Sequence, residues 1–297
     1  MKAAGVLSSA NWLGFAVVRL LRLLNPERML NAAIDGARLL RRHHRLALAM
    51  AKRELTSRYA GQALGSFWVI GHPMFQMMIF LFLFAVVFKV RINGSLEMPR
   101  DYTVYILSGL VPWLAILPVI TAAPASSIGN IAFVKQFKFE VEILPVKDVM
   151  IAMVFWVIGL VIIATYTFIH YFALPWTYLL LPYLLVIHVA TMVGSAWFLS
   201  AIAVFFRDLK DIVTVFANMG VYVLPVVYLP QWVPGIFKPF VYANPFSSII
   251  WMYQDALYFG GIYHPYAWIV GTVFAFVTFS GGHRVFQRLR PMFGSAL

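Results

Sequence analysis

The sequence predicts an all-α integral membrane protein with six transmembrane helices, an N-terminal amphipathic interfacial helix and short re-entrant helices between spans five and six. Of the 297 residues, 62% are hydrophobic and only 11% are charged, whereas a soluble domain carries roughly 25% charged residues. Apolar windows of about 20 residues, enough to cross a bilayer as a helix, recur along the chain. Such a composition cannot cover a water-facing surface, so a soluble fold is excluded.

Residues 1–66 are expected to form a basic segment before the first span. At the helical period, one face gathers Arg38, Arg41, Arg42, Arg45, Lys52 and Arg53. This pattern is typical of a helix that lies on the anionic lipids of the inner leaflet. Two alternatives stay open: a solvated basic face that only sets topology, and a helix that contacts a cytoplasmic partner or guides an anionic substrate.

Six apolar windows are the candidate spans, and together they define a transmembrane domain over residues 67–290. The windows cover residues 67–88, 104–125, 149–173, 176–206, 212–229 and 266–286. Gly71-His72-Pro73 predicts a kink in the first span, and Pro112, Pro118 and Pro124 predict bends in the second. A helix that is interrupted inside the bilayer leaves backbone N–H and C=O groups unpaired, so the interruption must be buried in protein or line a water-filled cavity.

The apolar segment between the last two spans, residues 230–262, does not fit a simple loop. Its prolines exclude an uninterrupted span. Gly260-Gly261 is expected to end a short helix over residues 246–259. We therefore expect short helices that dip back into the outer leaflet, with an ordinary extracytoplasmic cap as the alternative.

The distribution of lysine and arginine predicts the orientation. Nineteen of the 23 lie before the first span, in the second and fourth loops or in the tail. The other 4 lie in loops on the opposite side, and they are Lys89, Arg91, Arg100 and Lys238. Cytoplasmic loops carry the excess of these residues, so both termini, including the tail over residues 291–297, are expected in the cytoplasm. The formal net charge of +12 follows from the same bias and does not require nucleic acid.

Residues that carry chemistry are scarce. The chain has no cysteine, which excludes disulfides, thiolate catalysis and cysteine-ligated metals. It has no phosphate-cradling motif for ATP and no metal-binding pattern. Its acidic residues fall outside the predicted spans, so no proton relay is expected through the bilayer. Of the three intramembrane histidines, His188 is the best placed to line a pathway, with packing as the alternative. We expect no catalytic, cofactor-binding or metal-binding residue, so energy for any transport would come from a separate subunit.

Three stretches carry a family resemblance. They are Arg53-Glu54-Leu55-x-x-Arg58-Tyr59 with Leu64-Gly65, Trp68 and Pro73; Phe205-Phe206-Arg207-Asp208-Leu209-Lys210-Asp211; and Asn244-Pro245-Phe246 leading into Gln254-Asp255-Ala256-Leu257. Together they resemble three places in type-2 ABC exporter permeases: the entry to the first span, the Arg-Asp turn after the fourth span and the Asn-Pro segment before the sixth span. The resemblance is strongest to the branch that exports O-antigen, capsule or teichoic acid chains. The chain departs at Trp251 and Gln254, where the family often carries charged residues; an aromatic contact with sugar or lipid, or simple packing, would take their place.

The resemblance implies a permease subunit that moves a lipid-linked cell-surface polysaccharide across the cytoplasmic (inner) membrane of a bacterium. It implies a homodimer that pairs with two ATPase subunits, which would hold ATP and Mg²⁺. Residues 133–148 would be the coupling loop, docking through Lys135, Phe137, Lys138, Phe139, Glu140 and Glu142. Aromatic anchors among charges suit such a docked helix, and a solvated loop is the alternative. The cytoplasmic mouth would hold Arg53, Arg58, Tyr59, Arg207 and Asp208.

A channel for a hydrated glycan is also implied, with residues 230–262 as its extracytoplasmic gate. Sugars stack on aromatic faces, and the candidates are Trp113, Trp197, Tyr222, Tyr228, Trp232, Trp251 and Tyr253. Tryptophan and tyrosine also favour membrane interfaces, so anchoring or packing is the alternative at each position.

Three other functions stay open. The same fold exports drugs, peptides or small lipids. An integral-membrane glycosyl- or acyltransferase would need a carboxylate or histidine pair near a membrane face, and the chain offers only Glu97 and Asp101 there. A passive channel would need no docking loop.

Overall fold

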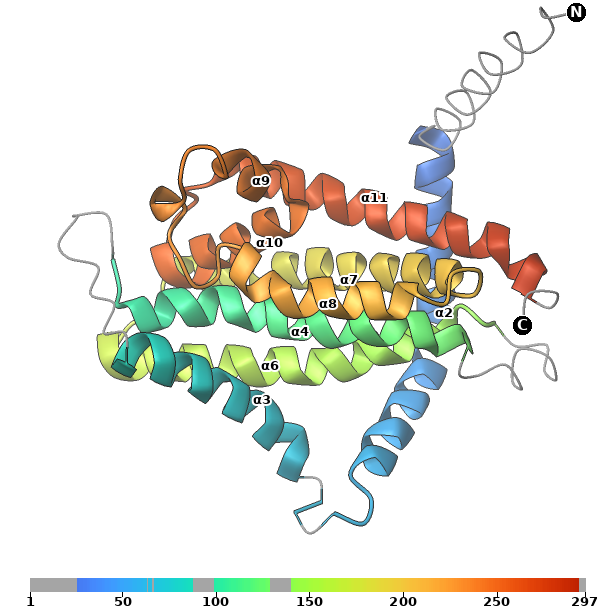
Figure 1. Cartoon of the computed structure of the whole chain (residues 1–297), viewed down its shortest axis with the longest axis horizontal. Coiled ribbons are helices and arrows are strands. Elements are labelled where there is room, and N and C mark those ends of the chain that lie inside the picture. Colours follow the sequence, from blue (N-terminus) through green and yellow to red (C-terminus); the bar gives the residue numbers. More distant parts are fainter. Residues whose placement is uncertain (1–25, 63, 66, 88–98, 129–139, 294–297) are drawn as a thin grey trace, which may run out of the picture.

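The computed structural model describes residues 26–62, 64–65, 67–87, 99–128 and 140–293, and all regular secondary structure within these ranges is helical (Figure 1). The long helices are α2 (Pro26–Arg58), α3 (Phe67–Leu81), α4 (Tyr102–Ile128), α6 (Ile143–Tyr171), α7 (Leu181–Ala203), α8 (Leu209–Val223) and α11 (Pro265–Leu289). A π-helical turn over Phe82–Val87 continues α3. A 3₁₀ turn over Trp176–Leu180 leads into α7, and another 3₁₀ turn over Arg290–Met292 follows α11. The predicted fold class, all-α, is confirmed.

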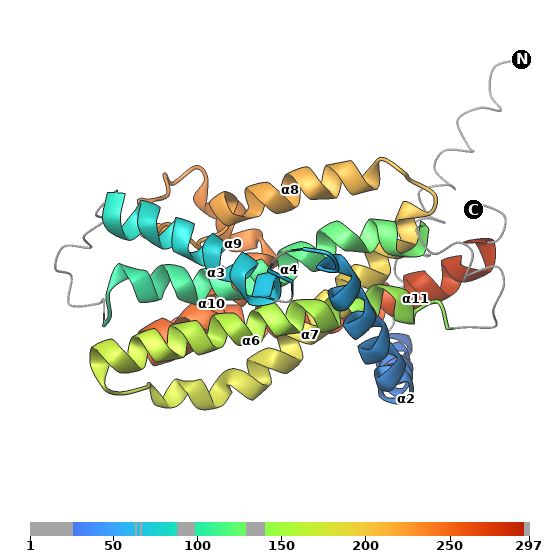
Figure 2. The same ribbon diagram turned by 90° about the horizontal axis from the view of Figure 1, so that it is seen from below.

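Helix α4 lies at the centre of the bundle. It carries no charged residue, and a helix that is apolar on every side is stable only when it is covered on every side. It packs against α6, α7, α8 and α10, and it lies between α8 and α6 (Figure 2). Its three prolines all stay inside the one helix.

Five helical segments are long and apolar enough to cross a membrane within the described part of the chain. They are Phe67–Phe84, Tyr102–Ser126, Ile143–Tyr171, Trp176–Ala203 and Pro265–Met292. The protein is therefore a multi-pass membrane protein, and five of the six predicted spans match such a segment.

The predicted span over residues 212–229 is not confirmed. Helix α8 has 15 residues and ends at Val223, after which Leu224 is extended (φ −82°, ψ 154°). Pro225 explains this end, because proline disfavours the helical conformation of the residue before it. A helix of that length rises about 22 Å, short of the roughly 30 Å of hydrocarbon in a bilayer.

Helix α6 begins at Ile143 rather than at residue 149. Its first turn buries Ile143, Leu144 and Val146 against the bundle, and proline is tolerated so close to a helix start. Asp148 therefore lies inside a candidate span, and the expectation that every acidic residue falls outside the spans was wrong at this position.

Helix α2 confirms the predicted N-terminal amphipathic helix. It buries Met29, Ala32, Gly36, Ala47 and Ala51 against α6 and α11. The six basic residues of the predicted stripe are all exposed. Its contact with lipid stays a prediction.

Residues 230–264, called the cap here, connect α8 to α11. They form the turn Pro230–Trp232, α9 (Lys238–Ala243), α10 (Pro245–Gln254) and the π-helical turn η4 (Asp255–Phe259). The Asn244 side chain caps α10 by accepting from the N–H of Phe246 at 3.0 Å. Gly260 ends η4 with φ 73°. The short helix and its glycine stop are thus confirmed, whereas its entry into a membrane stays a prediction.

The two ends of the bundle are formed by different segments: α9 and α10 lie at one end, and the start of α6, the turn between α7 and α8 and the end of α11 lie at the other (Figure 1). The cap lies at one end. The opposite end, called the basic end here, holds Lys147, Arg207, Lys210, Arg284, Arg288 and Arg290.

Helices α7 and α11 meet backbone to backbone. A Cβ at Gly194 would lie 2.3 Å from the carbonyl carbon and oxygen of Thr278, and a Cβ at Gly282 would lie 2.1 Å from the carbonyl oxygen of Gly194. Small residues permit such close approach between membrane helices, where packing drives association.

We predict that Gly282→Ala destabilises the protein because the added methyl group forces α7 and α11 apart. Overpacking of this kind costs about 1–3 kcal/mol, so the midpoint of thermal unfolding in detergent should fall by several degrees. Gly281→Ala is the matched control, since a Cβ there meets nothing within 4 Å. Equal midpoints for the two variants would contradict the close contact.

Candidate functional site

Lys147 connects the end of α2 to the start of α6. Its ammonium pairs with Glu54 on α2 and, at 3.0 Å, with Asp148. Glu54 also pairs with Arg58 at 3.2 Å. The side chain of Lys147 is 12% exposed and that of Asp148 is 6% exposed, so these charges compensate one another in a site poor in water.

A second network lies at the far end of the predicted coupling loop. Arg290 donates at 2.8 Å to a carboxylate oxygen of Glu140 and at 2.8 Å to one of Glu142. The indole N–H of Trp197 donates to the carbonyl of Glu142 at 2.9 Å. Burial raises the pKa of the Glu142 carboxyl above its ordinary value, and the Arg290 guanidinium opposes that shift. The loop end is thereby held by α7 and α11.

The structure places only part of the predicted coupling set. Glu140 and Glu142 belong to the network just described, whereas Lys135, Phe137, Lys138 and Phe139 lie outside the described residues. The docking role of this loop stays a prediction.

The predicted mouth residues form two separate groups. Arg53, Arg58 and Tyr59 lie at the end of α2, and Arg207 and Asp208 lie in the exposed turn before α8. Asp208 holds that turn through its carbonyl, which accepts from the N–H groups of residues 211 and 212 at 3.1 Å. No hydrogen bond or ion pair joins the two groups among the described residues, so a shared mouth stays a prediction.

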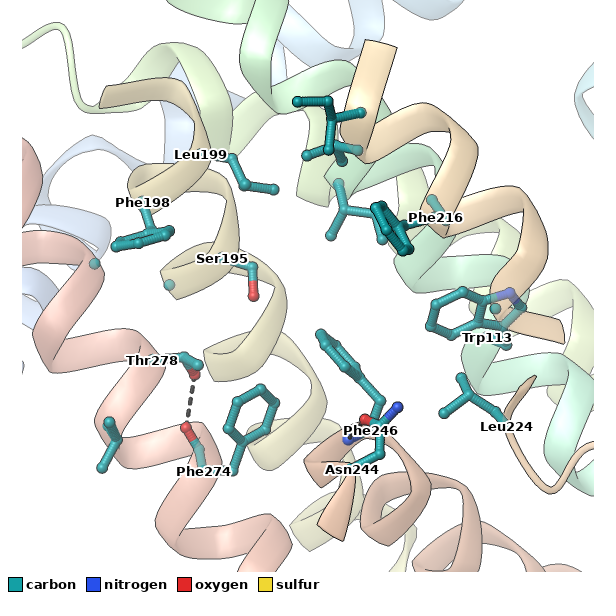
Figure 3. A pocket seen from close by; sticks show the side chains of 18 of the residues that line it. Trp113, Ser195, Phe198, Leu199, Phe216, Leu224, Asn244, Phe246, Phe274 and Thr278 are labelled. Carbon is teal, nitrogen blue, oxygen red and sulfur yellow. Dashed lines mark hydrogen bonds between the residues drawn. The ribbon is translucent and has the colours of Figure 1, made fainter. Parts of the chain in front are cut away.

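A cavity of about 680 Å³ lies between α8, α7 and α11, over α4 and α10 (Figure 3). We call it the α8 cavity. Its aromatic lining comes from Trp113, Phe198, Phe216, Phe246 and Phe274. Polar groups on its wall are few: Ser195, Asn244 and Thr278, whose hydroxyl donates to the carbonyl of Phe274 at 2.8 Å. This lining suits an apolar occupant more than a charged one.

Trp113 is the only predicted path residue among the lining of the α8 cavity. Its ring meets Phe246 edge-on at 6.0 Å. A Cβ at Gly220 would lie 2.0 Å from that ring, so the glycine lets α8 rest on the indole.

The other predicted path residues divide by exposure. Trp197, Trp251 and Tyr253 are buried, and the Tyr253 hydroxyl accepts from the indole of Trp156 at 2.8 Å. Three remain accessible: Tyr222 is 64% exposed, Trp232 is 51% exposed and Tyr228 is half-buried. The structure thus does not bring the seven into one continuous row within this chain, and their contact with a substrate stays a prediction.

His188 is fully buried between Trp156 and Tyr253, with its ring centre 5.5 Å from that of the tyrosine. Neither ring nitrogen has a hydrogen-bond partner among the described residues. The histidine is not part of the α8 cavity lining. In the described ranges, histidines and carboxylates form no group of three or more that could hold a metal ion.

Asp255 in the cap is a polar centre that its motif, Gln254-Asp255-Ala256-Leu257, does not reveal. Its fully buried carboxylate accepts from the backbone N–H of His264 at 3.0 Å, from His264 Nδ1 at 2.7 Å and from the indole of Trp268 at 2.9 Å. These bonds fasten η4 to the start of α11.

Long apolar helices with charges gathered toward their ends, and a large apolar cavity beside a short helix, are features of a membrane transport subunit. The chain belongs to the ABC-2 type transporter family, whose model matches residues 45–258. It is therefore a permease rather than an enzyme, and permeases of this family pair with ATPase subunits. The family predicted from the three sequence stretches is confirmed.

Individual relatives cover most of the chain. It is 25% identical over 257 residues to an O-antigen export system permease protein RfbA of Klebsiella pneumoniae. The aligned region covers 85% of this chain and 95% of the relative. A protein of the same name from Myxococcus xanthus is 23% identical over 215 residues, which spans 72% of this chain and 80% of the relative.

We predict that Lys147→Met destabilises the permease by about 3 kcal/mol, because it leaves the carboxylate of Asp148 buried without its partner. The measurement is the midpoint of thermal unfolding in detergent. Adding Asp148→Asn to the variant should recover part of the loss.

Arg38→Met is the matched control for this prediction. It breaks the Arg38–Asp35 pair, whose side chains are 77% and 61% exposed, and exposed pairs contribute roughly 0–1 kcal/mol. If both methionine variants unfold at the wild-type temperature, the Lys147 network does not stabilise the fold.

Proposed function

We propose that this chain is the transmembrane permease subunit of an ATP-binding-cassette exporter that moves a lipid-linked cell-surface polysaccharide across the cytoplasmic membrane of a bacterium. The observation that carries the proposal is the 25% identity over 257 residues to a protein named for O-antigen export, with 95% of that protein covered. A separate ATPase subunit would supply the energy and hold ATP and Mg²⁺.

The basic end supports the proposed orientation. Six lysines and arginines gather there, whereas the described residues of the cap end include only Arg100 and Lys238. The excess belongs in the cytoplasm, which would place both termini inside and the cap on the outer side. The exposed basic stripe of α2 would then face the anionic inner leaflet.

The anchored end of the coupling loop supports its proposed role. A docking loop transmits force only if it is fixed to the helices that move. Glu140 and Glu142 are fixed to α11 through Arg290, and Lys147 fixes the start of α6 to α2. ATPase motion applied to this loop would therefore act on three helices together.

The exposed face of α8 supports a homodimer. This helix packs mainly on α4, and Ile212, Val215, Phe216, Met219, Tyr222 and Val223 remain exposed along it. A second copy would cover this apolar face and bring two sets of Tyr222, Tyr228 and Trp232 toward one conduit. In this arrangement the accessible aromatics serve the glycan, while Trp197 and Tyr253 support the wall.

Export of a small lipid or drug by the same fold is the second candidate. The apolar lining of the α8 cavity favours it, because such a site suits an acyl or aromatic group rather than a sugar.

Deletion of the gene in its own bacterium distinguishes the two candidates. Under the proposed function, surface glycan disappears, the lipid-linked polymer accumulates inside the cell, and co-expression of the chain with its ATPase restores export. Intact surface glycan without internal polymer would refute polysaccharide export.

We predict that Phe137→Ala combined with Phe139→Ala uncouples ATP hydrolysis from export, because aromatic anchors dominate docked interfaces. The measurement compares ATPase activity with surface glycan in cells that produce the variant complex. Lys135→Gln serves as the control for lost charge alone, with a smaller expected effect. Wild-type export by the double variant would remove the coupling assignment.

A further inference from the structure

The α8 cavity is bounded by aromatic rings at the end nearer the cap. The ring of Phe246 lies edge-on to that of Trp113 with centres 6.0 Å apart and to that of Phe274 with centres 5.2 Å apart. All three residues line the cavity (Figure 3). Along α8 the lining runs from Ile212 to Val223, a rise of about 17 Å. The cavity is therefore elongated and follows α8 for most of its length.

The polar side chains on the cavity wall are few and partly engaged within the chain. Asn244 accepts from the N–H of Phe246 at 3.0 Å, and Thr278 donates to the carbonyl of Phe274 at 2.8 Å. Such a wall offers little to water or to a sugar, and apolar cavities take up apolar molecules instead. The lining thus selects a hydrocarbon group.

A hydrocarbon group can reach this lining. Phe198 on α7 is 44% exposed and Phe216 on α8 is 71% exposed, and both line the cavity. Helices α7 and α11 form two of its sides and belong to candidate membrane spans, so bilayer hydrocarbon surrounds the cavity. A lipid chain that enters gains the dispersion contacts that a void would lack.

The proposed second copy of the chain does not require this volume. Val215 and Tyr222 are exposed on α8 but do not line the cavity. At the helical period they lie on a different side of α8 from the lining residues Phe216 and Gly220. A second copy that packs on Val215 and Tyr222 leaves the cavity to another occupant.

The cavity-lining faces of α8 and α11 both continue to basic residues at the basic end. On α8, Lys210 precedes the lining residue Val213 by three positions. On α11, Arg284 and Arg288 follow the lining residue Gly281 by three and seven positions. These spacings place residues on one face of a helix. An amphiphile in the cavity would therefore have its apolar end near the cap and its head among cations.

The acidic residues near the start of α8 do not share this face. Asp211 lies about 200° around the helix from Val213, almost opposite the lining, and Asp208 belongs to the exposed turn before the helix. Positive charge therefore predominates where the two lining faces reach the basic end, which suits an anionic head group such as a phosphate.

We propose that the α8 cavity binds the hydrocarbon anchor of the exported lipid-linked polysaccharide, with a phosphate of the anchor at Lys210 and Arg288 and the tail directed toward Phe246. The volume of about 680 Å³ lies within the range of ligand sites, about 300–1,000 Å³, and matches one chain better than the two chains of a phospholipid. This inference rests on the proposed function. The basic end faces the cytoplasm in that function, so the site would hold the anchor before export.

The test is photo-crosslinking of the full-length permease, purified with its ATPase in phosphatidylcholine nanodiscs. The probe is farnesyl phosphate with a diazirine in its chain, and mass spectrometry locates the label. Unlabelled farnesyl phosphate, farnesol and phosphatidylglycerol serve as competitors. We expect label on the lining segments of α7, α8 and α11, with farnesyl phosphate as the strongest competitor.

Two valines on α11 provide a matched pair of variants. Val277 lines the cavity and is 39% exposed, whereas Val273, one turn away, is 55% exposed and outside the lining. Val277→Phe should reduce labelling severalfold because the larger ring occupies the cavity. Val273→Phe makes the same chemical change and should label as the wild type does. Size-exclusion profiles check that both variants are folded.

The phosphate contact has its own variants. Lys210→Gln and Arg288→Gln should each reduce the preference for farnesyl phosphate over farnesol about fivefold, which is the contribution of one basic residue beside an anionic lipid. Arg38→Gln removes an exposed positive charge from α2 and should leave that preference unchanged.

The proposal is overturned if the lining is not labelled, as when a second copy fills the cavity, or if phosphatidylglycerol competes as well as farnesyl phosphate, as at a site for bulk membrane lipid. Equal labelling of the two folded valine variants, or an unchanged preference in both glutamine variants, also overturns it. Intact surface glycan in the deletion strain refutes polysaccharide export itself, whereas an unlabelled cavity together with failed export in that strain refutes only the anchor site.

Discussion

A bilayer cannot hydrate an unpaired charge, and this constraint organises the whole molecule. The central helix α4 has no charged residue. Charged residues that lie close to the apolar core are paired. Lys147 pairs with Glu54 and Asp148, and Asp255 is hydrogen-bonded to His264 and Trp268. The polar networks therefore lie toward the ends of the bundle.

Composition and periodicity were sufficient for the class of fold and for most of the spans, because hydrocarbon length imposes the same window on every crossing helix. They failed at α8. The apolar window over residues 212–229 looks like a span, but Pro225 ends the helix at Val223. A hydropathy window weighs residues by transfer energy and ignores the conformation that a proline imposes on its neighbour.

The candidate site was less predictable than the fold. Glu54 and Asp255 belong to two of the sequence motifs, yet their partners lie elsewhere: Lys147 is far along the chain from Glu54, and Trp268 belongs to α11. Contacts between distant segments leave no periodic signal in one sequence. The aromatic residues illustrate the same limit, since exposed Tyr222 and buried Trp197 have similar local surroundings in the sequence.

Helix α11 connects the Asp255 network in the cap to the Arg290 network as a single rod. Near its start, Trp268 donates to Asp255 in the cap; just past its end, Arg290 binds Glu140 and Glu142. Its 25 residues rise about 37 Å, and a continuous helix is stiff along its axis. A displacement of Glu140 and Glu142 along the axis of α11 would therefore move the cap by a similar amount, so the two ends of the bundle would move together.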